Sequence, residues 1–215
     1  TTGCLVIPLN SVVAREISIQ IKQKTFQKTY LALVRGGEKS FDTKSGRLQD
    51  HLLYTDGRGS VDKSGKEAIT DWELLSSSKK APISLLMFKL VTGKKHQLRL
   101  HASKVLKAPI LGDGVYSLSN VSQSILDVTT VPENRLFLHA HEVSLFKYRE
   151  DGKRYRLGVR APLPNDFQRI CKELDIPLPP LFTKPSLIID GQVAGKNSDL
   201  KLWNALDAEQ LIRVS

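Results

Sequence analysis

The segment that most constrains the fold is an apolar stretch at 83–91, which runs into Gly93 and then into a cationic run at 94–101. We interpret this segment as a buried strand that ends at a glycine turn and leads into the start of a helix. Three apolar residues follow at helical spacing, so one helix face is expected to pack inward: Leu98, Ala102 and Val105. The other face of the helix start is then free to hold a ligand.

The cationic run suits an anion. Arg99 projects from a different helix face near the N-terminus, and its planar guanidinium can hold two oxygens of a carboxylate or a phosphate at once. Lys94 and Lys95 alone would be typical of a solvated basic turn. Their combination with Gln97 and His101 favours a binding site over that alternative.

The remaining pattern predicts an α+β fold, with a mainly antiparallel mixed sheet and flanking helices. Apolar or alternating stretches predict strands at 4–8, 28–34, 66–75, 136–141, 143–148 and 154–161. Asp151-Gly152 predicts a hairpin between the last two. A helix is expected after Ser11 as its N-cap, with Val13, Ile17 and Ile21 on one face, and a second helix at 166–174. We expect one domain at 1–162 and a C-terminal extension at 163–215.

The formal net charge of +10 and the pI of about 9.6 predict a polyanionic partner, nucleic acid before all others. A membrane surface is the competing partner. We expect no membrane association, because the sequence contains neither an amphipathic basic helix nor an apolar run of membrane-spanning length. With two cysteines, no disulfide framework is indicated, and an intracellular compartment is expected, whether mitochondrial, nuclear or cytoplasmic.

Metal binding is not expected. His96 and His101 have no Cys or third His at ligand spacing. His139 and His141 alternate within an apolar stretch, which is typical of structural histidines whose ring nitrogens are hydrogen-bonded.

Six segments give the chain a more specific likeness. They are 1–6 (TTGCLV), 28–34 (KTYLALV), 65–70 (GKEAIT), 92–101 (TGKKHQLRLH), 109–116 (PILGDGVY) and 135–140 (RLFLHA). In this order and at this spacing, the chain resembles the RluA-like family of RNA pseudouridine synthases over about residues 1–162.

The resemblance implies a pseudouridine synthase catalytic domain that isomerises specific uridines of rRNA or tRNA to pseudouridine, without a cofactor or a metal and as a monomer. By motif position, Tyr30 would stack on the flipped base and take the C5 proton, and Arg99 would pair with the carboxylate of a catalytic Asp. Leu138 would lie beneath the uracil, although ordinary core packing explains it nearly as well. The candidate RNA contacts are Lys28, Arg47, Lys94, Lys95, His96 and Gln97. An aromatic platform and a cationic surround are what a flipped base requires.

One departure from the family pattern matters most. The family's catalytic Asp follows His-Arg-Leu, a segment whose Asp would fall three residues before Thr1. Asp50 and Asp113 follow no Arg-Leu pair, so neither replaces it. We therefore expect the chain as given to be inactive alone. Two hypotheses follow: an enzyme whose catalytic segment precedes Thr1, or a catalytically inactive RNA-binding or ribosome-assembly protein that retains the fold.

Overall fold

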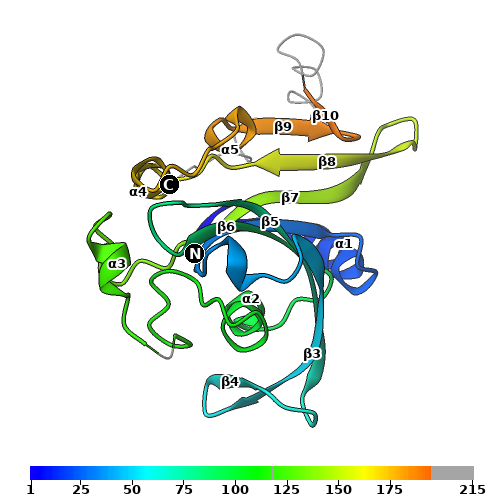
Figure 1. The fold of residues 1–215 in the computed structure, drawn as a ribbon. Coiled ribbons are helices and arrows are strands. Elements are labelled where there is room, and N and C mark those ends of the chain that lie inside the picture. The colour runs from blue at the N-terminus through cyan, green and yellow to red at the C-terminus, as the bar shows by residue number, and fades with distance from the viewer. Residues whose placement is uncertain (118, 195–215) are drawn as a thin grey trace.

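The computed structural model describes residues 1–117 and 119–194, and a ten-stranded sheet runs through this part of the chain (Figure 1). Its strands are β1 (Thr2–Gly3), β2 (Gln27–Arg35), β3 (Ser45–Thr55), β4 (Arg58–Val61), β5 (Lys66–Ser77), β6 (Ile83–Leu90), β7 (Leu138–Tyr148), β8 (Arg154–Arg160), β9 (Ser186–Ile189) and β10 (Gln192–Val193). The spatial order is β10-β9-β8-β7-β2-β6-β5-β3-β4, antiparallel throughout, and β1 pairs in parallel with β7. The predicted α+β fold with a mainly antiparallel mixed sheet is confirmed.

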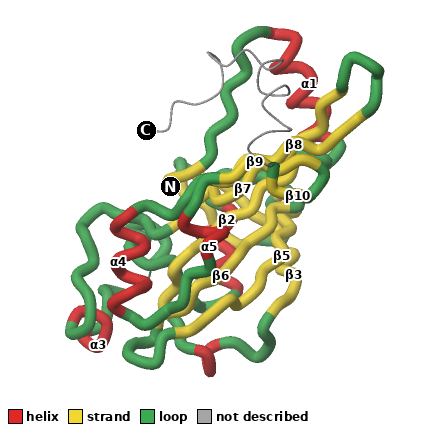
Figure 2. Tube along the Cα trace, turned by 90° about the horizontal axis from the view of Figure 1, so that it is seen from above, coloured by secondary structure: helices red, strands yellow, loops and turns green. Residues whose placement is uncertain are grey.

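Short helices flank the sheet. They are α1 (Ser11–Lys22), α2 (Gln97–Leu100), α3 (Gln123–Leu126), α4 (Asn165–Glu173) and α5 (Pro180–Thr183), with a 3-10 turn at Glu38–Ser40 and a π-helical turn at His101–Val105 after α2. The tube view shows α3 and α4 near one end of the sheet and α1 at the other (Figure 2). Within the described ranges, no helix has the length and apolar character to cross a bilayer.

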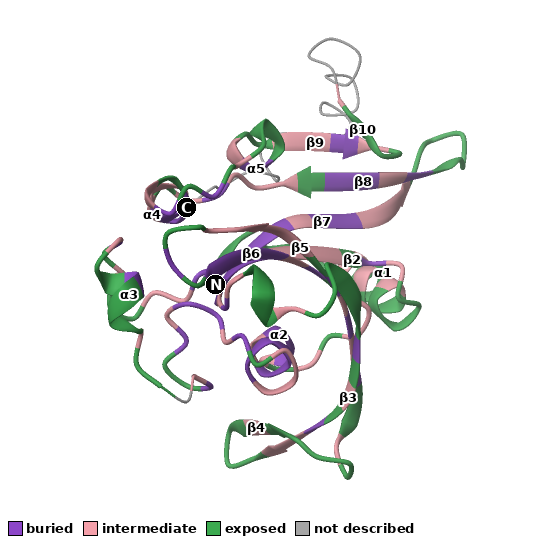
Figure 3. Cartoon of the chain, in the orientation of Figure 1, coloured by how far each residue is buried: buried purple, intermediate pink, exposed green. Residues whose placement is uncertain are grey.

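The central strand β2 divides the core in two, because successive side chains of a strand point to opposite faces. Leu31 and Leu33 pack into the cluster that contains α4. Ala32 and Val34 pack into the cluster that contains Leu98 of α2. All four β2 side chains are fully buried, and purple marks this buried centre in Figure 3.

The described part of the predicted C-terminal extension belongs to the same core. In α4, Phe167, Ile170 and Cys171 are fully buried, and β9 adds to the sheet beside β8. The predicted boundary after residue 162 therefore falls inside one sheet and one core. Residues 195–215 of that extension lie outside the described residues.

The predicted strand at 4–8 is wrong. Only Thr2–Gly3 pairs with β7, opposite His139 and Ala140, because β8 occupies the same edge of β7 from Glu142 onward. Gly3 has a φ of +105°, and a Cβ there would lie 2.2 Å from the carbonyl oxygen of Ala140. This close approach requires glycine.

The predicted helix start is shifted by one residue. Asn10, not Ser11, is the N-cap of α1, and its side chain accepts a hydrogen bond from Val13 N at 2.9 Å. Contrary to the expected apolar inner face, α1 has no buried residue. The hairpin at Asp151-Gly152 is confirmed, with Gly152 at a φ of +78° between β7 and β8.

Candidate active site

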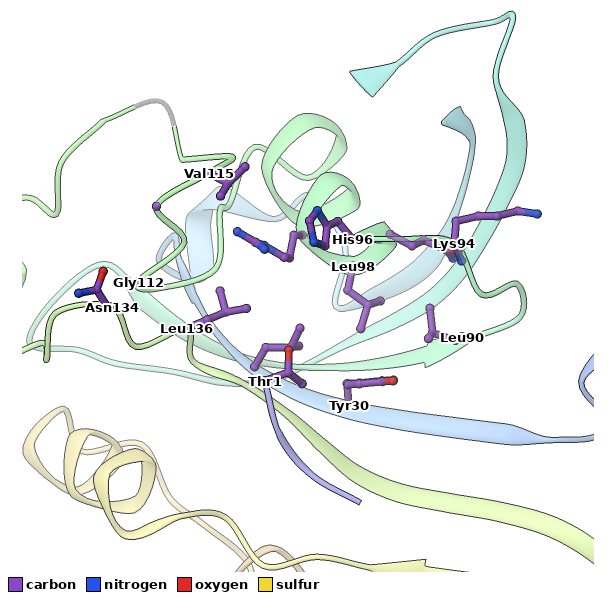
Figure 4. A pocket seen from close by; sticks show the side chains of 14 residues that line it. Thr1, Tyr30, Leu90, Lys94, His96, Leu98, Gly112, Val115, Asn134 and Leu136 are labelled. Atoms are coloured by element: carbon purple, nitrogen blue, oxygen red, sulfur yellow. The ribbon is translucent and has the colours of Figure 1, made fainter. Parts of the chain in front are cut away.

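A pocket of about 840 Å³ lies on the α2 side of the sheet (Figure 4). This volume is within the usual range for small-ligand sites. Its apolar lining comes from β6, α2 and the start of β7, namely Leu90, Leu98, Leu136 and Leu138. Polar and cationic side chains converge on the same space: Tyr30, Lys94, His96 and Arg99. With Thr1 and the 112–115 loop included, five segments distant in sequence therefore build one concave site.

Gln97 fixes the turn that carries the cationic residues. Its side-chain oxygen accepts hydrogen bonds from Thr92 Oγ1 and Lys94 N, both at 3.0 Å. Its side-chain nitrogen donates to Ile69 O at 2.9 Å and to Thr70 Oγ1 at 2.8 Å. Gln97 is 2% exposed, and both ends of its amide are used inside the protein. Its role in this structure is to hold the turn, and its amide has no free group for an RNA contact.

Arg99 makes a two-pronged ion pair with Asp113. Nε lies 2.9 Å from Oδ2 and Nη2 lies 2.6 Å from Oδ1. Asp113 also accepts from the backbone N–H groups of Val115 and Tyr116, and its side chain is fully buried. Burial opposes ionisation of this carboxyl, but Arg99 and the two N–H groups outweigh it, and its pKa lies below the usual range. Asp113 is therefore a fixed anion that orients Arg99.

Tyr30 and Leu138 come from neighbouring strands. β2 and β7 pair Tyr30 with Ala140 and Ala32 with Leu138, so both side chains reach the pocket from the sheet. Burial raises the pKa of Tyr30, whose ring is half-buried. The pocket therefore contains a neutral phenol ring above an apolar floor.

His96 is the second polar group of the pocket that the fold holds in place. It has a φ of +53°, in the left-handed region, and shares a 2.8 Å hydrogen bond between Nδ1 and the Tyr116 hydroxyl. Gly59 N of β4 donates to the same hydroxyl at 3.1 Å, so the hydroxyl hydrogen is free to point at His96. Burial, followed by the charges of Arg99 and Lys95, lowers the pKa of His96. His96 therefore acts as a neutral hydrogen-bond acceptor.

Tyr116 is a site residue to which the sequence assigned no role. Its ring centroid lies 5.1 Å from the Arg99 guanidinium carbon, and its hydroxyl joins His96 to β4. The sequence does place Tyr116 in the 109–116 segment, three residues after Asp113. That spacing does not show that Tyr116 contacts Arg99, His96 and Gly59.

Three predicted RNA contacts lie outside the pocket. Arg47 of β3 pairs with Asp71 of β5 at 2.7 Å on the exposed face. Lys28 lies on β2 two residues before Tyr30, with its ammonium 5.2 Å from the Phe26 ring centroid. Lys95 is exposed on the turn. The pocket gathers the other predicted residues, namely Tyr30, Lys94, His96, Gln97, Arg99 and Leu138.

His139 and His141 are buried within β7. His139 and His141 both donate to the carbonyl of Ala161, at 3.2 and 3.0 Å, and His139 also accepts from Thr2 Oγ1 at 3.0 Å. Nε2 of His141 has no hydrogen-bond partner among the described residues. In the same part of the chain, no group of three or more His, Cys, Asp or Glu side chains is placed to hold a metal ion.

Comparison with known proteins gives a consistent family. Residues 1–104 match the model of the RNA pseudouridylate synthase family. The chain is 31% identical over 172 residues to an RNA pseudouridine synthase of Zymomonas mobilis, covering 78% of this chain and 70% of the relative. It is 35% identical over 146 residues to the ribosomal large subunit pseudouridine synthase D of Borreliella burgdorferi, covering 67% of this chain but 41% of the relative.

A solved structure shows a similar fold. Human RNA pseudouridylate synthase domain containing 4 superposes with a TM-score of 0.62 at 22% identity, over 79% of this chain and 70% of that structure. The chain thus spans 70% of the length of the Zymomonas mobilis relative and 41% of the length of the Borreliella burgdorferi relative.

Proposed function

Since this chain belongs to the RNA pseudouridine synthase family, as an RluA-like member, we propose that its pocket isomerises a uridine of rRNA or tRNA to pseudouridine. The supporting observation is the convergence of one aromatic ring, one oriented guanidinium and an apolar floor in a single pocket. The base would be flipped out of its stack to enter the pocket. The N-glycosidic bond breaks, the uracil turns, and C5 bonds to C1′ of the ribose while C5 loses its proton and N1 gains one.

Tyr30 is the proposed platform for the uracil and the acceptor of the C5 proton. Because burial keeps its phenol protonated, Tyr30 accepts that proton only as it gives up its own to water in the open pocket. Leu138 provides the apolar contact on the floor, and Lys94 attracts the adjoining phosphate. In this scheme the pocket needs neither metal nor cofactor, and one copy of the chain is sufficient.

The carboxylate that starts the reaction is, in our proposal, outside residues 1–215. Asp113 does not qualify, because two backbone N–H groups and Arg99 occupy its oxygens. Thr1 lines the pocket, and its backbone nitrogen lies within the electrostatic influence of Arg135 and Arg99. A carboxylate joined just before Thr1 would meet the same two guanidinium groups, which favour its ionised form. We propose that residues 1–215 alone do not catalyse the isomerisation.

The test is tritium release from RNA labelled at C5 of uridine. A chain extended upstream by a His-Arg-Leu-Asp segment is expected to release tritium, whereas residues 1–215 are not. Tyr30→Phe in the extended chain should bind RNA normally and release no tritium, because it keeps the ring and loses the hydroxyl. Full activity of that variant would refute the proton-acceptor role. No release by the extended wild type would identify an RNA-binding protein without catalysis.

The cellular site is part of the proposal. An intracellular compartment that contains rRNA or tRNA fits the activity, and mitochondrial, nuclear and cytoplasmic compartments all meet this condition. Fractionation of cells followed by detection of the native chain would decide among the three.

A further inference from the structure

A second cationic surface lies away from the pocket, where the β7–β8 hairpin meets the end of α1. We define the basic hairpin surface by six residues that these segments and the start of β2 contribute: Lys22, Lys24, Lys28, Lys147, Arg149 and Arg154. Figure 2 shows α1 beside this hairpin at one end of the sheet. All six side chains are exposed or half-buried.

Specific contacts hold α1 against the hairpin. β2 begins at Gln27, opposite Ser144, so Phe146 lies beyond its last strand partner on that edge. The side-chain amide of Gln20 fills the gap, accepting from Phe146 N at 2.7 Å and donating to Phe146 O at 2.9 Å. Arg156 of β8 donates to Thr25 O at 3.0 Å on the other side of this junction. These contacts fix the end of α1 against the hairpin, so the cations of these segments gather at one end of the sheet.

Two acidic residues, Glu150 and Asp151, lie in the turn of the hairpin, and Asp151 pairs with Lys153 rather than with a residue of this surface. Five other arginines in the described residues pair with carboxylates: Arg47, Arg99, Arg135, Arg160 and Arg169. None of the six residues of the basic hairpin surface forms an ion pair with the described part of the chain. Aromatic rings support two of them instead. The Arg154 guanidinium lies 4.0 Å from the Phe146 ring centroid, and that of Arg149 lies 5.5 Å from the Tyr155 centroid.

An exposed aromatic ring accompanies these charges. Tyr148, at the end of β7, is 69% exposed and lies opposite Arg154 in the strand pairing. Exposed aromatic rings among cations are the combination that single-stranded nucleic acid recognises, because bases stack on the rings while phosphates meet the cations.

The surface continues from the pocket along two strands. Lys28 lies two residues from Tyr30 on β2, on the same strand face. On β7, Val143 pairs with Lys28, so Lys147 lies on the same face as Tyr30. Tyr148 and its partner Arg154 lie on the opposite face, about 26 Å along the strand from Ala140. A strand of RNA leaving the pocket along β2 and β7 would therefore meet Lys28 and Lys147 first, and would reach Tyr148 and Arg154 by passing round the end of the hairpin.

We propose that the basic hairpin surface binds the single-stranded RNA that flanks the target uridine. The phosphates would lie on the six cations as the RNA passes from the pocket face round the end of the hairpin, and one base would stack on Tyr148 on the far face. This inference rests on the proposed function, because it takes the RNA in the pocket as its starting point. It assigns to the hairpin the binding of an extended RNA, separate from the chemistry.

The first experiment removes charge without disturbing packing. The triple variant Lys22→Gln, Lys24→Gln, Lys147→Gln is compared with wild type for binding to a uridine-containing single strand of roughly 20 nucleotides. The matched control is Lys39→Gln, Lys79→Gln, Lys107→Gln, three exposed lysines near the opposite end of β2. We expect the hairpin variant to bind at least about tenfold more weakly at low salt, with a salt-dependence slope smaller by about 2, since each lost phosphate contact in single strands lowers it by about 0.7. The control variant should match wild type.

A second pair of measurements separates stacking from charge. Tyr148→Ala is expected to weaken binding about fivefold or more at an unchanged salt slope, whereas Tyr148→Phe retains binding. A short RNA of roughly 5 nucleotides, too short to reach the hairpin, should bind wild type and the triple variant equally.

Three results would overturn the assignment: unchanged affinity and slope in the triple variant, an equal loss in the control variant, or tighter binding of wild type to phosphatidylserine vesicles than to the RNA. The proposed function fails separately. Hairpin-dependent RNA binding without tritium release by the extended chain would refute the catalytic proposal and support the surface, and full release with unchanged binding would do the reverse.

Discussion

Single residues of the pocket owe their positions to polar atoms that are already paired inside the protein. The side-chain amide of Gln97 forms hydrogen bonds that hold the turn. The carboxylate of Asp113 accepts hydrogen bonds from Arg99 and from two backbone N–H groups. Such side chains orient their neighbours and are poor candidates for direct contact with RNA. Removing one of them leaves buried partners unsatisfied, which costs more than the net gain from a typical hydrogen bond.

Gln97→Leu tests this at the turn. The substitution removes the hydrogen bonds of the amide, so its buried partners lose theirs. We expect the free energy of unfolding to fall by about 1–3 kcal/mol per unsatisfied buried group. Chemical denaturation measures the change. Gln49→Leu is the matched control, because Gln49 makes an exposed contact with Glu67, and its effect should stay within about 0.5 kcal/mol. Equal effects of the two variants would contradict the assigned role.

His141 makes stability depend on pH. Burial lowers its pKa to about 4. None of the described residues accepts a hydrogen bond from Nε2, which carries an N–H group when the ring is protonated. The unfolded chain protonates this residue near pH 6.5, so the neutral ring contributes stability that is fully present above pH 6.5 and is lost as pH falls towards 4, by up to about 3 kcal/mol.

His141→Leu should remove this part of the pH dependence, measured as the free energy of unfolding at pH 7 and at pH 4.5. The carbonyl of Ala161 keeps its other donor, His139, in the variant. His51→Leu, at an exposed position, should leave the wild-type slope unchanged. An unaltered slope in His141→Leu would assign the effect to other groups.

Among the elements, the β3–β4 hairpin is attached to the pocket through Tyr116. The Tyr116 hydroxyl accepts from Gly59 of β4 and bonds His96, and Tyr54 of β3 donates to the carbonyl of Lys95. The hairpin and the cationic turn therefore share two anchor points. A loss at one of them should loosen the hairpin without unfolding the sheet.

Tyr116→Phe tests that attachment. It keeps the ring beside Arg99 and removes both hydrogen bonds of the hydroxyl. We expect a loss of about 1 kcal/mol per bond and faster hydrogen exchange at the Gly59 amide, with β2 and β6 unchanged. Tyr148→Phe, whose ring is exposed, provides the control. Unchanged exchange at Gly59 would show that Tyr54 alone anchors the hairpin.

At the scale of the whole molecule, one hydrophobic cluster joins the central sheet to residues after 162. The cluster that buries Leu31 and Leu33 of β2 also contains Phe167, Ile170 and Leu174 of α4. Residues after 162 therefore stabilise the strand that carries Tyr30, from the face opposite the pocket.

Phe167→Ala is expected to cost about 3–5 kcal/mol, because its fully buried ring packs edge-on against Phe137 at 5.7 Å. Thermal unfolding should remain a single transition, with a midpoint at a lower temperature. Hydrogen exchange at the backbone amides of β2 and β6 should become faster in the same variant. Leu181→Ala on α5 removes a side chain that is 42% exposed and should change little. Two separate transitions in Phe167→Ala would divide the chain at the sequence boundary.

Local pattern predicted the elements that depend on local contacts. The strands at 28–34 and 83–91, the inward face of Leu98 and Ala102 and the hairpin at Gly152 all follow from periodicity or turn chemistry. The 4–8 stretch is apolar enough for a strand but fails because β8 occupies the edge that it would need. Competition between distant segments leaves no local signal.

The pocket likewise combines features that the sequence predicts with features that depend on distant segments. Motif order singled out Tyr30, Arg99 and Leu138, and all three line one pocket. The partner of Arg99 could not be predicted, because the position of Asp113 depends on the backbone conformation of Gly112. Gly112 has a φ of +75° and has no room for a Cβ beside the carbonyl oxygen of Arg135. By contrast, Phe167, Ile170, Cys171 and Leu174 fall at i, i+3, i+4 and i+7, so the burial of α4 was readable without any motif.

The parallel pairing of β1 with β7 has a consequence for synthesis. Thr2 and Gly3 are made long before their partners, His139 and Ala140. While a ribosome adds residues from the N-terminus onward, the pocket lacks a wall until β7 has emerged. The nascent chain is thus unable to enclose a uridine base while most of it is still being translated, although its cations are already exposed to ribosomal RNA. The late arrival of one strand sets the moment at which a basic polypeptide becomes selective for its substrate.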